Sequence, residues 1–256
     1  MFIMFINLLL NEPVILLIII LIGFMAGIIK GIVGFALPMI LITGLSIFIP
    51  IEQALASLIL PTIITNFIQS FTVSKSSFFS TIVNYKTFLF FFSIFLILGS
   101  QFYLIFSSEL IMGLIGIILF TYTFLQILGI QFKFKNNSLL TIITASINGV
   151  LGGIAGIWGP LTVSYLMSLK IEKNEQIKVQ GIIYSLGSVF LLLGHLYSGI
   201  FNKYTFSLSL SLVPLCIVGL FIGSIIRNKI KQTTFKTFTL VMILLASINL
   251  LRKAFL

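Results

Sequence analysis

The chain has 256 residues, of which 59% are hydrophobic and 8% are charged. Its mean hydropathy is +1.24, whereas soluble domains carry about a quarter of their residues as charges. The apolar runs extend to about twenty residues, which is typical of membrane-spanning helices and longer than the roughly ten-residue strands of a membrane barrel. The composition therefore predicts an all-α polytopic membrane protein and excludes a soluble globular domain.

The charge balance is basic, with 15 lysines and arginines against 5 aspartates and glutamates and a net charge of +10. These basic residues are spread between apolar segments, so the positive-inside rule explains them better than a nucleic-acid partner does. The sequence contains no nucleotide-binding loop and no metal-ligand cluster. We expect no cofactor, no metal and no nucleic acid.

The first half begins with two apolar pieces, 14–29 and 33–48, separated by a glycine break at 31–34. Each piece is about 16 residues or roughly 24 Å long, which is short for a bilayer core of about 30 Å. The pieces are therefore either tilted spans or the two arms of a re-entrant hairpin. Three spans of ordinary length follow, predicted at 53–73, 85–105 and 110–130.

The second half repeats this plan around a second glycine break. Its predicted segments are 139–154 and 159–169, followed by spans at 176–197, 204–226 and 235–251. We therefore divide the chain into a first membrane repeat (1–130), a connecting cytoplasmic loop (131–138) and a second membrane repeat (139–256). The competing interpretation is that any two hydrophobic stretches look alike.

Matched glycines and prolines favour a true repeat. Pro160 lies 122 positions after Pro38. The same offset relates Gly27, Gly31 and Gly34 to Gly149, Gly153 and Gly156. Glycine and proline both disfavour a continuous helix. Such interruptions at corresponding positions of two halves are the best sequence indication of a transporter's binding site.

Loop charge predicts how the two halves are oriented. In the first half the lysines Lys75 and Lys86 share one loop, whereas the equivalent loop of the second half holds only Lys203. The other two loops of the second half, 170–178 and 227–236, are rich in basic residues. If each broken region enters and leaves by one face, all lysine-rich loops are cytoplasmic and the two repeats are inverted copies with both termini outside. A single crossing at each break contradicts the charge rule.

The breaks have a chemistry suited to anions. The first backbone N–H groups of a helix lack partners within that helix, and the helix dipole adds about half a positive charge there. Hydrocarbon cannot satisfy such groups, so protein, water or a ligand must do so. Glycine lets a ligand approach the backbone, and proline fits the first helical turn. The alternative is that the glycines only allow close helix packing.

At this point the sequence resembles a known family. The signature of the first half is Gly23, Gly27, Gly31, Gly34 and Pro38, and that of the second half is Asn148, Gly149, Gly152, Gly153, Gly156, Gly159 and Pro160. Together they are similar to the two halves of the sulfite exporter TauE/SafE family. The resemblance covers essentially the whole chain. It implies a multi-pass permease of the inner (plasma) membrane that exports sulfite, sulfoacetate or a related sulfur-containing anion.

The candidate site is a substrate-binding site, with no catalytic residues. Its members are Lys30, Gly31, Gly34, Pro38, Asn66, Gly153, Gly156, Trp158, Gly159, Pro160 and Gln180. Lys30 is either a counter-charge for an anion or a cytoplasmic headgroup anchor. Trp158 either walls the site or anchors at the interface. Asn66 and Gln180, with Tyr184 one turn further on, either line the pathway or form interhelical hydrogen bonds.

The acidic residues limit the mechanism. All five, Glu12, Glu52, Glu109, Glu172 and Glu175, fall at segment ends, so we expect no buried carboxylate to relay protons or bind sodium. We therefore expect an exporter of anions driven by the membrane potential, with a small anionic substrate and the lipid bilayer as its partners, and room for a homo-oligomer. The alternatives are a cation carrier, a permease for an unrelated small solute, a membrane scaffold, and an enzyme built on Lys30 and His195.

Overall fold

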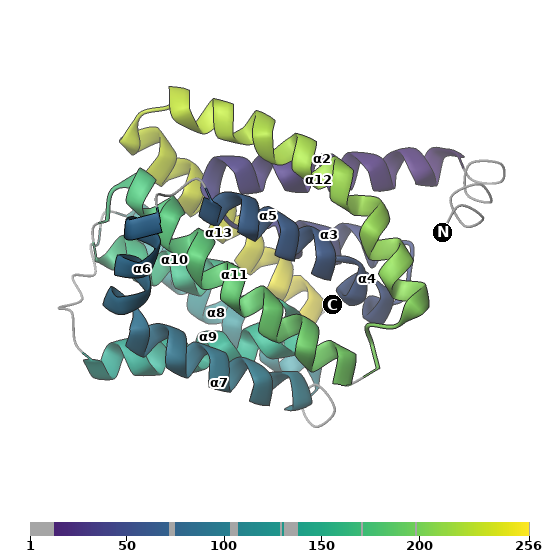
Figure 1. The fold of residues 1–256 in the computed structure, drawn as a ribbon, viewed down its shortest axis with the longest axis horizontal. Coiled ribbons are helices and arrows are strands. Elements are labelled where there is room, and N and C mark those ends of the chain that lie inside the picture. The colour runs from purple at the N-terminus through teal and green to yellow at the C-terminus, as the bar shows by residue number, and fades with distance from the viewer. Residues whose placement is uncertain are drawn as a thin grey trace.

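The computed structural model describes residues 13–71, 75–102, 107–128, 130, 138–169, 171–197 and 199–255. The regular structure in these ranges is α-helical (Figure 1). The helices are α2 (Pro13–Val33), α3 (Leu37–Leu45), α4 (Ile51–Ser57), α5 (Ile59–Phe71), α6 (Lys75–Asn84), α7 (Lys86–Phe102), α8 (Ser108–Ile127), α9 (Ser138–Ala155), α10 (Gly159–Ser168), α11 (Lys173–Tyr197), α12 (Lys203–Lys229) and α13 (Gln232–Phe255). The predicted connecting loop lies outside the described residues, except for Ser138, which begins α9.

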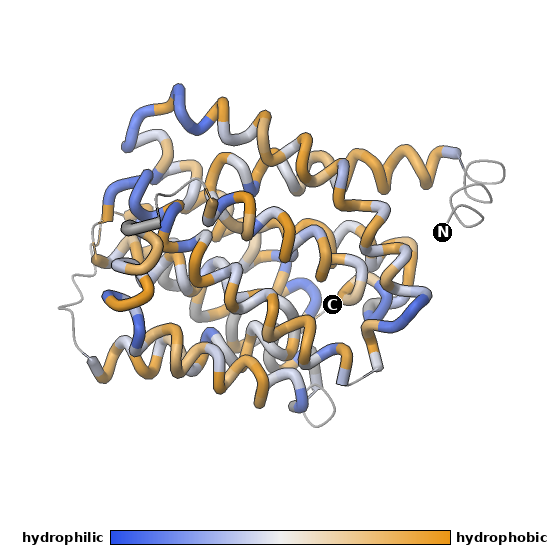
Figure 2. Tube along the Cα trace, in the orientation of Figure 1, coloured by the Kyte–Doolittle hydropathy of each residue, from blue (hydrophilic) through white to orange (hydrophobic). Residues whose placement is uncertain are grey.

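Five segments of the described chain are long and apolar enough to cross a membrane: α2, the stretch Glu52–Phe71, α11, α12 and α13. A sixth span results if α6 and α7 are counted together, although they are bent by 78°. Hydrophilic residues gather at the helix ends, notably at the end that carries α6 and the α12–α13 connection (Figure 2). The all-helical membrane fold expected from composition is therefore confirmed.

The first broken region is a hairpin. Helix α2 continues to Val33, and a short connection with Gly34 at φ +83° and Ala36 at φ +77° leads into α3. Gly44 near the end of α3 lies against the side chain of Ile22, so α3 folds back along α2. The expected break at 31–34 was placed too early, because Gly31 is held inside the helix by close packing on α12.

The second broken region is a hairpin as well. Helix α9 ends at Ala155, Gly156 takes φ +67°, and α10 begins at Gly159. Thr141 near the start of α9 and Tyr165 near the end of α10 share a hydrogen bond of 3.0 Å between their hydroxyl oxygens. The two arms therefore lie side by side. Pro38 and Pro160 both occupy the first turn of the returning arm, where a missing N–H is harmless.

Each hairpin is packed on a helix from the other half of the chain, α2 on α12 and α9 on α7. Between α2 and α12, glycines lie against backbone carbonyls in three places: Gly27 on Cys216, Gly31 on Leu220 and Gly223 on Ile28. Between α9 and α7 the three contacts are Gly149 on Phe92, Gly153 on Leu96 and Gly99 on Val150. A methyl group at any of these glycines would lie within 2.6 Å of the partner's carbonyl oxygen. Small residues at these positions allow the backbones to touch.

The predicted span at 53–73 is interrupted. Helix α4 ends at Ser57 and α5 begins at Ile59, because Pro61 has no N–H to donate to the carbonyl of Ser57. The hydroxyl of Ser209 on α12 donates to that carbonyl (2.9 Å) and accepts from the N–H of Leu60 (2.9 Å). This repair across the helix interface stabilises the start of α5. The span expected at 85–105 corresponds to α7, and α6 precedes it across a bend of 78°.

Candidate functional site

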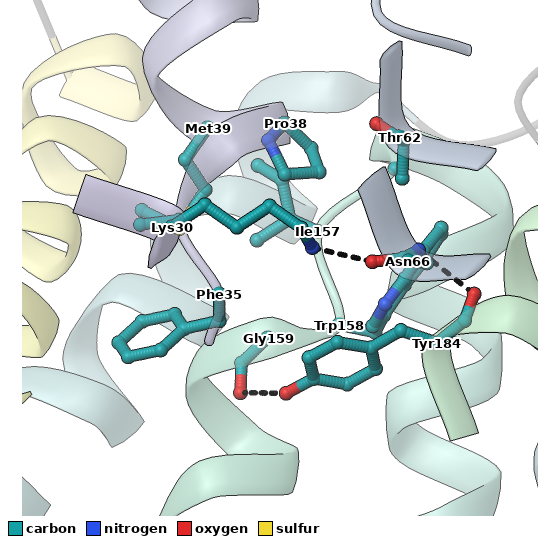
Figure 3. Close-up of a pocket in the computed structure, with 12 residues that line it drawn as sticks. Lys30, Phe35, Pro38, Met39, Thr62, Asn66, Ile157, Trp158, Gly159 and Tyr184 are labelled. Carbon is teal, nitrogen blue, oxygen red and sulfur yellow. Dashed lines mark hydrogen bonds between the residues drawn. The ribbon is translucent and has the colours of Figure 1, made fainter. Parts of the chain in front are cut away.

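The tips of the two hairpins meet at a small buried cavity, which the side chains of α5 and α11 complete (Figure 3). Its lining residues are Lys30, Phe35, Ala36, Pro38, Met39, Thr62, Asn66, Gly156, Ile157, Trp158, Gly159 and Tyr184. The free space is about 10 Å³, at the lower limit for one water molecule. The described conformation is therefore closed around the site, and a polyatomic ligand would require the hairpin tips to separate.

Lys30 is the charged residue in this lining. Its side chain is 1% exposed, and its ammonium group donates a hydrogen bond to Oδ1 of Asn66. The Nζ atom also lies 5.9 Å from the centre of the Tyr184 ring. No ion pair joins Lys30 to a carboxylate among the residues that the structure describes. Lys30 is thus buried in protein, and the structure does not favour a headgroup anchor.

Two hydrogen bonds hold the groups around Lys30. Asn66 donates from Nδ2 to the backbone carbonyl of Tyr184 (2.9 Å), so its Oδ1 faces the lysine. The Tyr184 hydroxyl donates to the carbonyl of Gly159 at the tip of the second hairpin (3.1 Å). Figure 3 shows Lys30 reaching across the cavity toward Asn66, with the Tyr184 ring on the opposite side from Pro38. Lys30, Asn66 and Tyr184 therefore join α2, α5 and α11 at one point.

Thr62 adds a polar group to the cavity that has no partner. Its side chain is 1% exposed, and its hydroxyl oxygen makes no hydrogen bond to any residue that the structure describes. Buried hydroxyl groups are usually paired, because leaving one unsatisfied costs about 1–3 kcal/mol. Thr62 lies one helical turn before Asn66 on α5, so both residues face the same cavity. A ligand with hydrogen-bonding oxygens would satisfy it.

The two returning helices begin at the cavity. Ala36 and Met39 line it at the start of α3, and Trp158 and Gly159 line it at the start of α10. The first N–H groups of a helix have no partner within it, and both helix dipoles direct partial positive charge toward this point. The cavity therefore combines one ammonium group, one unpaired hydroxyl and two positive helix ends.

The eleven predicted site residues separate into two groups. Those that line the cavity are Lys30, Pro38, Asn66, Gly156, Trp158 and Gly159. The others, Gly31, Gly34, Gly153, Pro160 and Gln180, do not. Gly31 and Gly153 serve helix packing, as the alternative interpretation of the glycines stated.

Gln180 holds the tip of the first hairpin from outside the cavity. With its amide oriented to satisfy its neighbours, it donates to the carbonyls of Val33 (3.2 Å) and Gly34 (3.3 Å) and accepts from the side chain of Gln176 (3.1 Å). It therefore satisfies carbonyls at the C-terminal end of α2, which lack partners within the helix. Its role is interhelical hydrogen bonding.

Other lining residues were not among the predicted site residues: Phe35, Ala36, Met39, Thr62, Ile157 and Tyr184. Phe35, Ala36 and Ile157 sit inside the breaks, so their position next to the glycines was a usable signal. The only sequence signal for Thr62 as a site residue was its position one helical turn from Asn66. Met39 is apolar and carries no signal that separates it from the core.

The model of the family described as sulfite exporter TauE/SafE matches residues 19–250. The chain belongs to the sulfite exporter TauE/SafE family. Neither a curated protein nor a solved structure matches it.

TauE/SafE membership covers the hairpins, α5 and α11, and therefore every residue that lines the cavity. It implies a membrane transporter of sulfur-containing anions, which agrees with the membrane-length apolar helices. The family is one of transporters. For a TauE/SafE protein, the cavity between the hairpin tips is the natural candidate for the transport site.

Proposed function

We propose that this protein exports small sulfur-containing anions, such as sulfite or sulfoacetate, across the plasma membrane, and that the cavity at the hairpin tips is its substrate site. The observation that carries the proposal is Lys30, an ammonium group buried next to neutral partners. An isolated charge is costly to bury unless an opposite charge or strong hydrogen bonds offset the cost. A bound oxyanion supplies that opposite charge.

The polar groups around Lys30 suit an oxyanion of this kind. Sulfite and sulfonate groups present three oxygens around one sulfur atom. The Lys30 ammonium and the Thr62 hydroxyl are hydrogen-bond donors in the lining, and the first N–H groups of α3 and α10 are further donors. Because the described lining of the cavity contains no carboxylate, an anion meets no like charge among these residues. A cation carrier would need the opposite arrangement.

We further propose that the two halves are inverted repeats. Helix α2 runs parallel to α12, because Gly27 contacts Cys216 and Gly31 contacts Leu220. Helix α9 runs parallel to α7 in the same way, and α11 also runs parallel to α7, through the contacts of Gly187 and Gly194. Figure 1 has α12 returning in the direction opposite to α11. Helices α2 and α9 therefore run in opposite directions, which supports an inverted relation.

The membrane potential drives export in this proposal. An anion leaving a cell gains about 2.3 kcal/mol per charge for each 100 mV of inside-negative potential. The five acidic residues all lie at segment ends, so no carboxylate is available within the membrane for proton or sodium coupling. Potential-driven export requires no coupling ion.

The test is flux in proteoliposomes that hold the purified protein. Labelled sulfite, sulfoacetate, sulfate and a monovalent cation are offered under an imposed potential of either sign. We expect saturable flux of one sulfur-containing anion that reverses its preferred direction with the sign of the potential. Flux that is unchanged when the potential is held at zero would contradict the proposal that the membrane potential drives export. No anion flux from protein shown to be folded would contradict the substrate class.

A further inference from the structure

A second cavity lies at the end of the bundle where α7 begins at Lys86 and α11 begins at Lys173. We call this end the lysine-rich end. The volume of the cavity is about 410 Å³. Most of its lining is polar: Asn84, Thr87, Ser138, Thr141, Tyr165 and Glu175. These residues come from the junction of α6 and α7, the starts of α9 and α11, and the end of α10. Glu175 is paired with Lys178 at 3.0 Å, which reduces its repulsion of an incoming anion.

A series of aromatic rings fills the space between this cavity and Lys30. Tyr165 and Phe88, which line the large cavity, have ring centres 5.3 Å apart, and Phe88 and Phe92 follow at 6.0 Å. Phe92 then contacts Trp158 at 6.1 Å, and Trp158 contacts Tyr184 at 6.4 Å. The last two rings line the small cavity. All five rings are buried, so a hydrated anion cannot pass while they stay in place.

Phe92 is the middle ring of this series and has room to occupy its position because α11 carries a glycine there. A methyl group at Gly187 would lie 2.6 Å from Cε1 of Phe92. Phe92 is inaccessible to solvent. Phe90, two residues earlier on the same helix, points outward with 60% of its surface exposed. Phe92 therefore lies in the barrier between the two cavities, whereas Phe90 lies on the outside of the bundle.

The opposite end of the molecule lacks part of this polar lining, although Thr87, Tyr165 and Glu175 correspond to the polar residues Ser211, Thr43 and Gln53. The offset between the repeats relates Ser138 and Thr141 to Leu16 and Ile19 in α2. Asn84 and Phe88 correspond to Leu208 and Leu212 in α12 through the offset that relates Gly99 to Gly223. These four aliphatic residues are buried, and close packing of apolar side chains excludes water.

We propose that the large cavity is a cytoplasmic vestibule that receives the sulfur-containing anion, and that Phe92, with Phe88 and Trp158, is the gate between the vestibule and Lys30. The proposal rests on the proposed transport function. The lysine-rich end is the cytoplasmic end by the positive-inside rule. The vestibule keeps the anion hydrated, whereas the aromatic rings would strip its water without replacing the hydrogen bonds. The anion reaches Lys30 only when the Phe92 ring moves.

The sidedness of the vestibule is tested by cysteine labelling. Cys216 is the single cysteine, so Cys216→Ser yields a background for one introduced thiol. In membrane vesicles of either orientation, a membrane-impermeant anionic methanethiosulfonate should modify Thr141→Cys at least about tenfold faster from the cytoplasmic side, since modification requires an exposed thiolate. The matched variant Ile19→Cys should react slowly from both sides. Faster labelling of Thr141→Cys from outside, or equal rates for both variants, would overturn the vestibule.

The gate is tested with a reporter beyond it. Thr62→Cys in the same background should react slowly from the cytoplasm, and adding Phe92→Ala should raise its rate at least about tenfold by opening the route to the buried thiol. Phe90→Ala, on the same helix, should leave the rate unchanged. An unchanged rate with Phe92→Ala, or with the milder Phe92→Leu if the alanine variant does not fold, would overturn the gate. The labelling needs no transported substrate, so it stands apart from any failure of sulfite flux.

Discussion

The two hairpins have the same shape but different contents. Each is a helix, a turn with a left-handed glycine and a short returning helix, and each packs on a helix of the other half through three matched glycine contacts. Only the first carries a buried charge, since Gly152 in the second corresponds to Lys30. Backbone packing thus gives both hairpins the same architecture, whereas the side chains at the tips differ, so that only the first hairpin supplies a charge to the site.

The tips are also held differently. Gly34 of the first hairpin contacts Ile177 and Gln180 of α11, whereas Gly156 of the second contacts Leu55 and Leu58 at the corresponding positions. Polar carbonyls at the first tip are satisfied by the Gln180 amide.

The second hairpin is instead joined within itself. With its amide oriented to satisfy its neighbours, Asn148 donates to the Trp158 carbonyl (2.8 Å) and accepts from the N–H (3.0 Å) and the hydroxyl (2.8 Å) of Thr162. The corresponding residue of the first hairpin is Ala26, which cannot do this. The first tip is therefore held by the Gln180 side chain of α11, and the second is held by its own arms together with the Tyr184 hydroxyl of α11.

The largest expected effect comes from removing the charge that distinguishes the two tips. Lys30→Met should reduce anion flux about 30-fold or more, because losing a buried charged partner costs about 2 kcal/mol or more. Lys30→Arg should retain part of the flux. The exposed Lys203→Met is the matched control and should transport normally. Normal flux in Lys30→Met proteoliposomes would remove Lys30 from the site.

A smaller effect separates the two left-handed glycines. An alanine at either position takes an unfavourable φ, which costs about 1–2 kcal/mol. At Gly34 the added methyl would also lie 1.9 Å from the Gln180 amide, whereas at Gly156 its nearest neighbour is 3.5 Å away.

Gly34→Ala should therefore lower the free energy of unfolding by about 1–3 kcal/mol more than Gly156→Ala, the range for overpacking. The measurement is reversible unfolding in mixed detergent micelles. Equal losses for the two variants would show that the tips are equally crowded.

The helix-packing glycines should behave alike in both halves. Gly31→Ala and Gly153→Ala each introduce a methyl group 2.3 Å from a carbonyl oxygen of the partner helix. Each should cost about 1–3 kcal/mol of stability in the same micelle assay, because the helices must move apart. Gly23→Ala is the control, since its nearest contact would be 3.4 Å. A clear difference between the two variants would argue against matched halves.

The smallest effect is expected from making the first tip resemble the second. Gln180→Leu removes the donor to the Val33 and Gly34 carbonyls and should destabilise the protein by about 1 kcal/mol, the typical net value of a hydrogen bond. Leu58→Met, at the corresponding position near the second tip, keeps an apolar side chain of similar volume and should cost less. A shift in the midpoint of thermal unfolding, followed by size-exclusion chromatography, measures both. No shift for Gln180→Leu would mean that the amide does not support the tip.

Much of the fold follows from local sequence. The long apolar runs require helices, because backbone groups in hydrocarbon must be satisfied within the same segment. Helix α2 ends at Val33 and α9 at Ala155, next to glycines of the two predicted breaks, and Pro38 and Pro160 lie in the first turns of α3 and α10. Lys30, Asn66 and Trp158 could be selected as site candidates because polar or aromatic residues near a break have few other uses in a membrane.

The tertiary structure decided which glycines serve packing and which face the site. Gly31 and Gly34 are alike in the sequence, but only the approach of α12 keeps Gly31 in a helix, and only the turn requires a left-handed conformation at Gly34. In the same way, Gln180 and Tyr184 lie one turn apart on α11, yet one supports a hairpin tip and the other lines the cavity. Local sequence determines where a helix can form or break. The direction that each side chain faces depends on contacts between segments far apart in the chain.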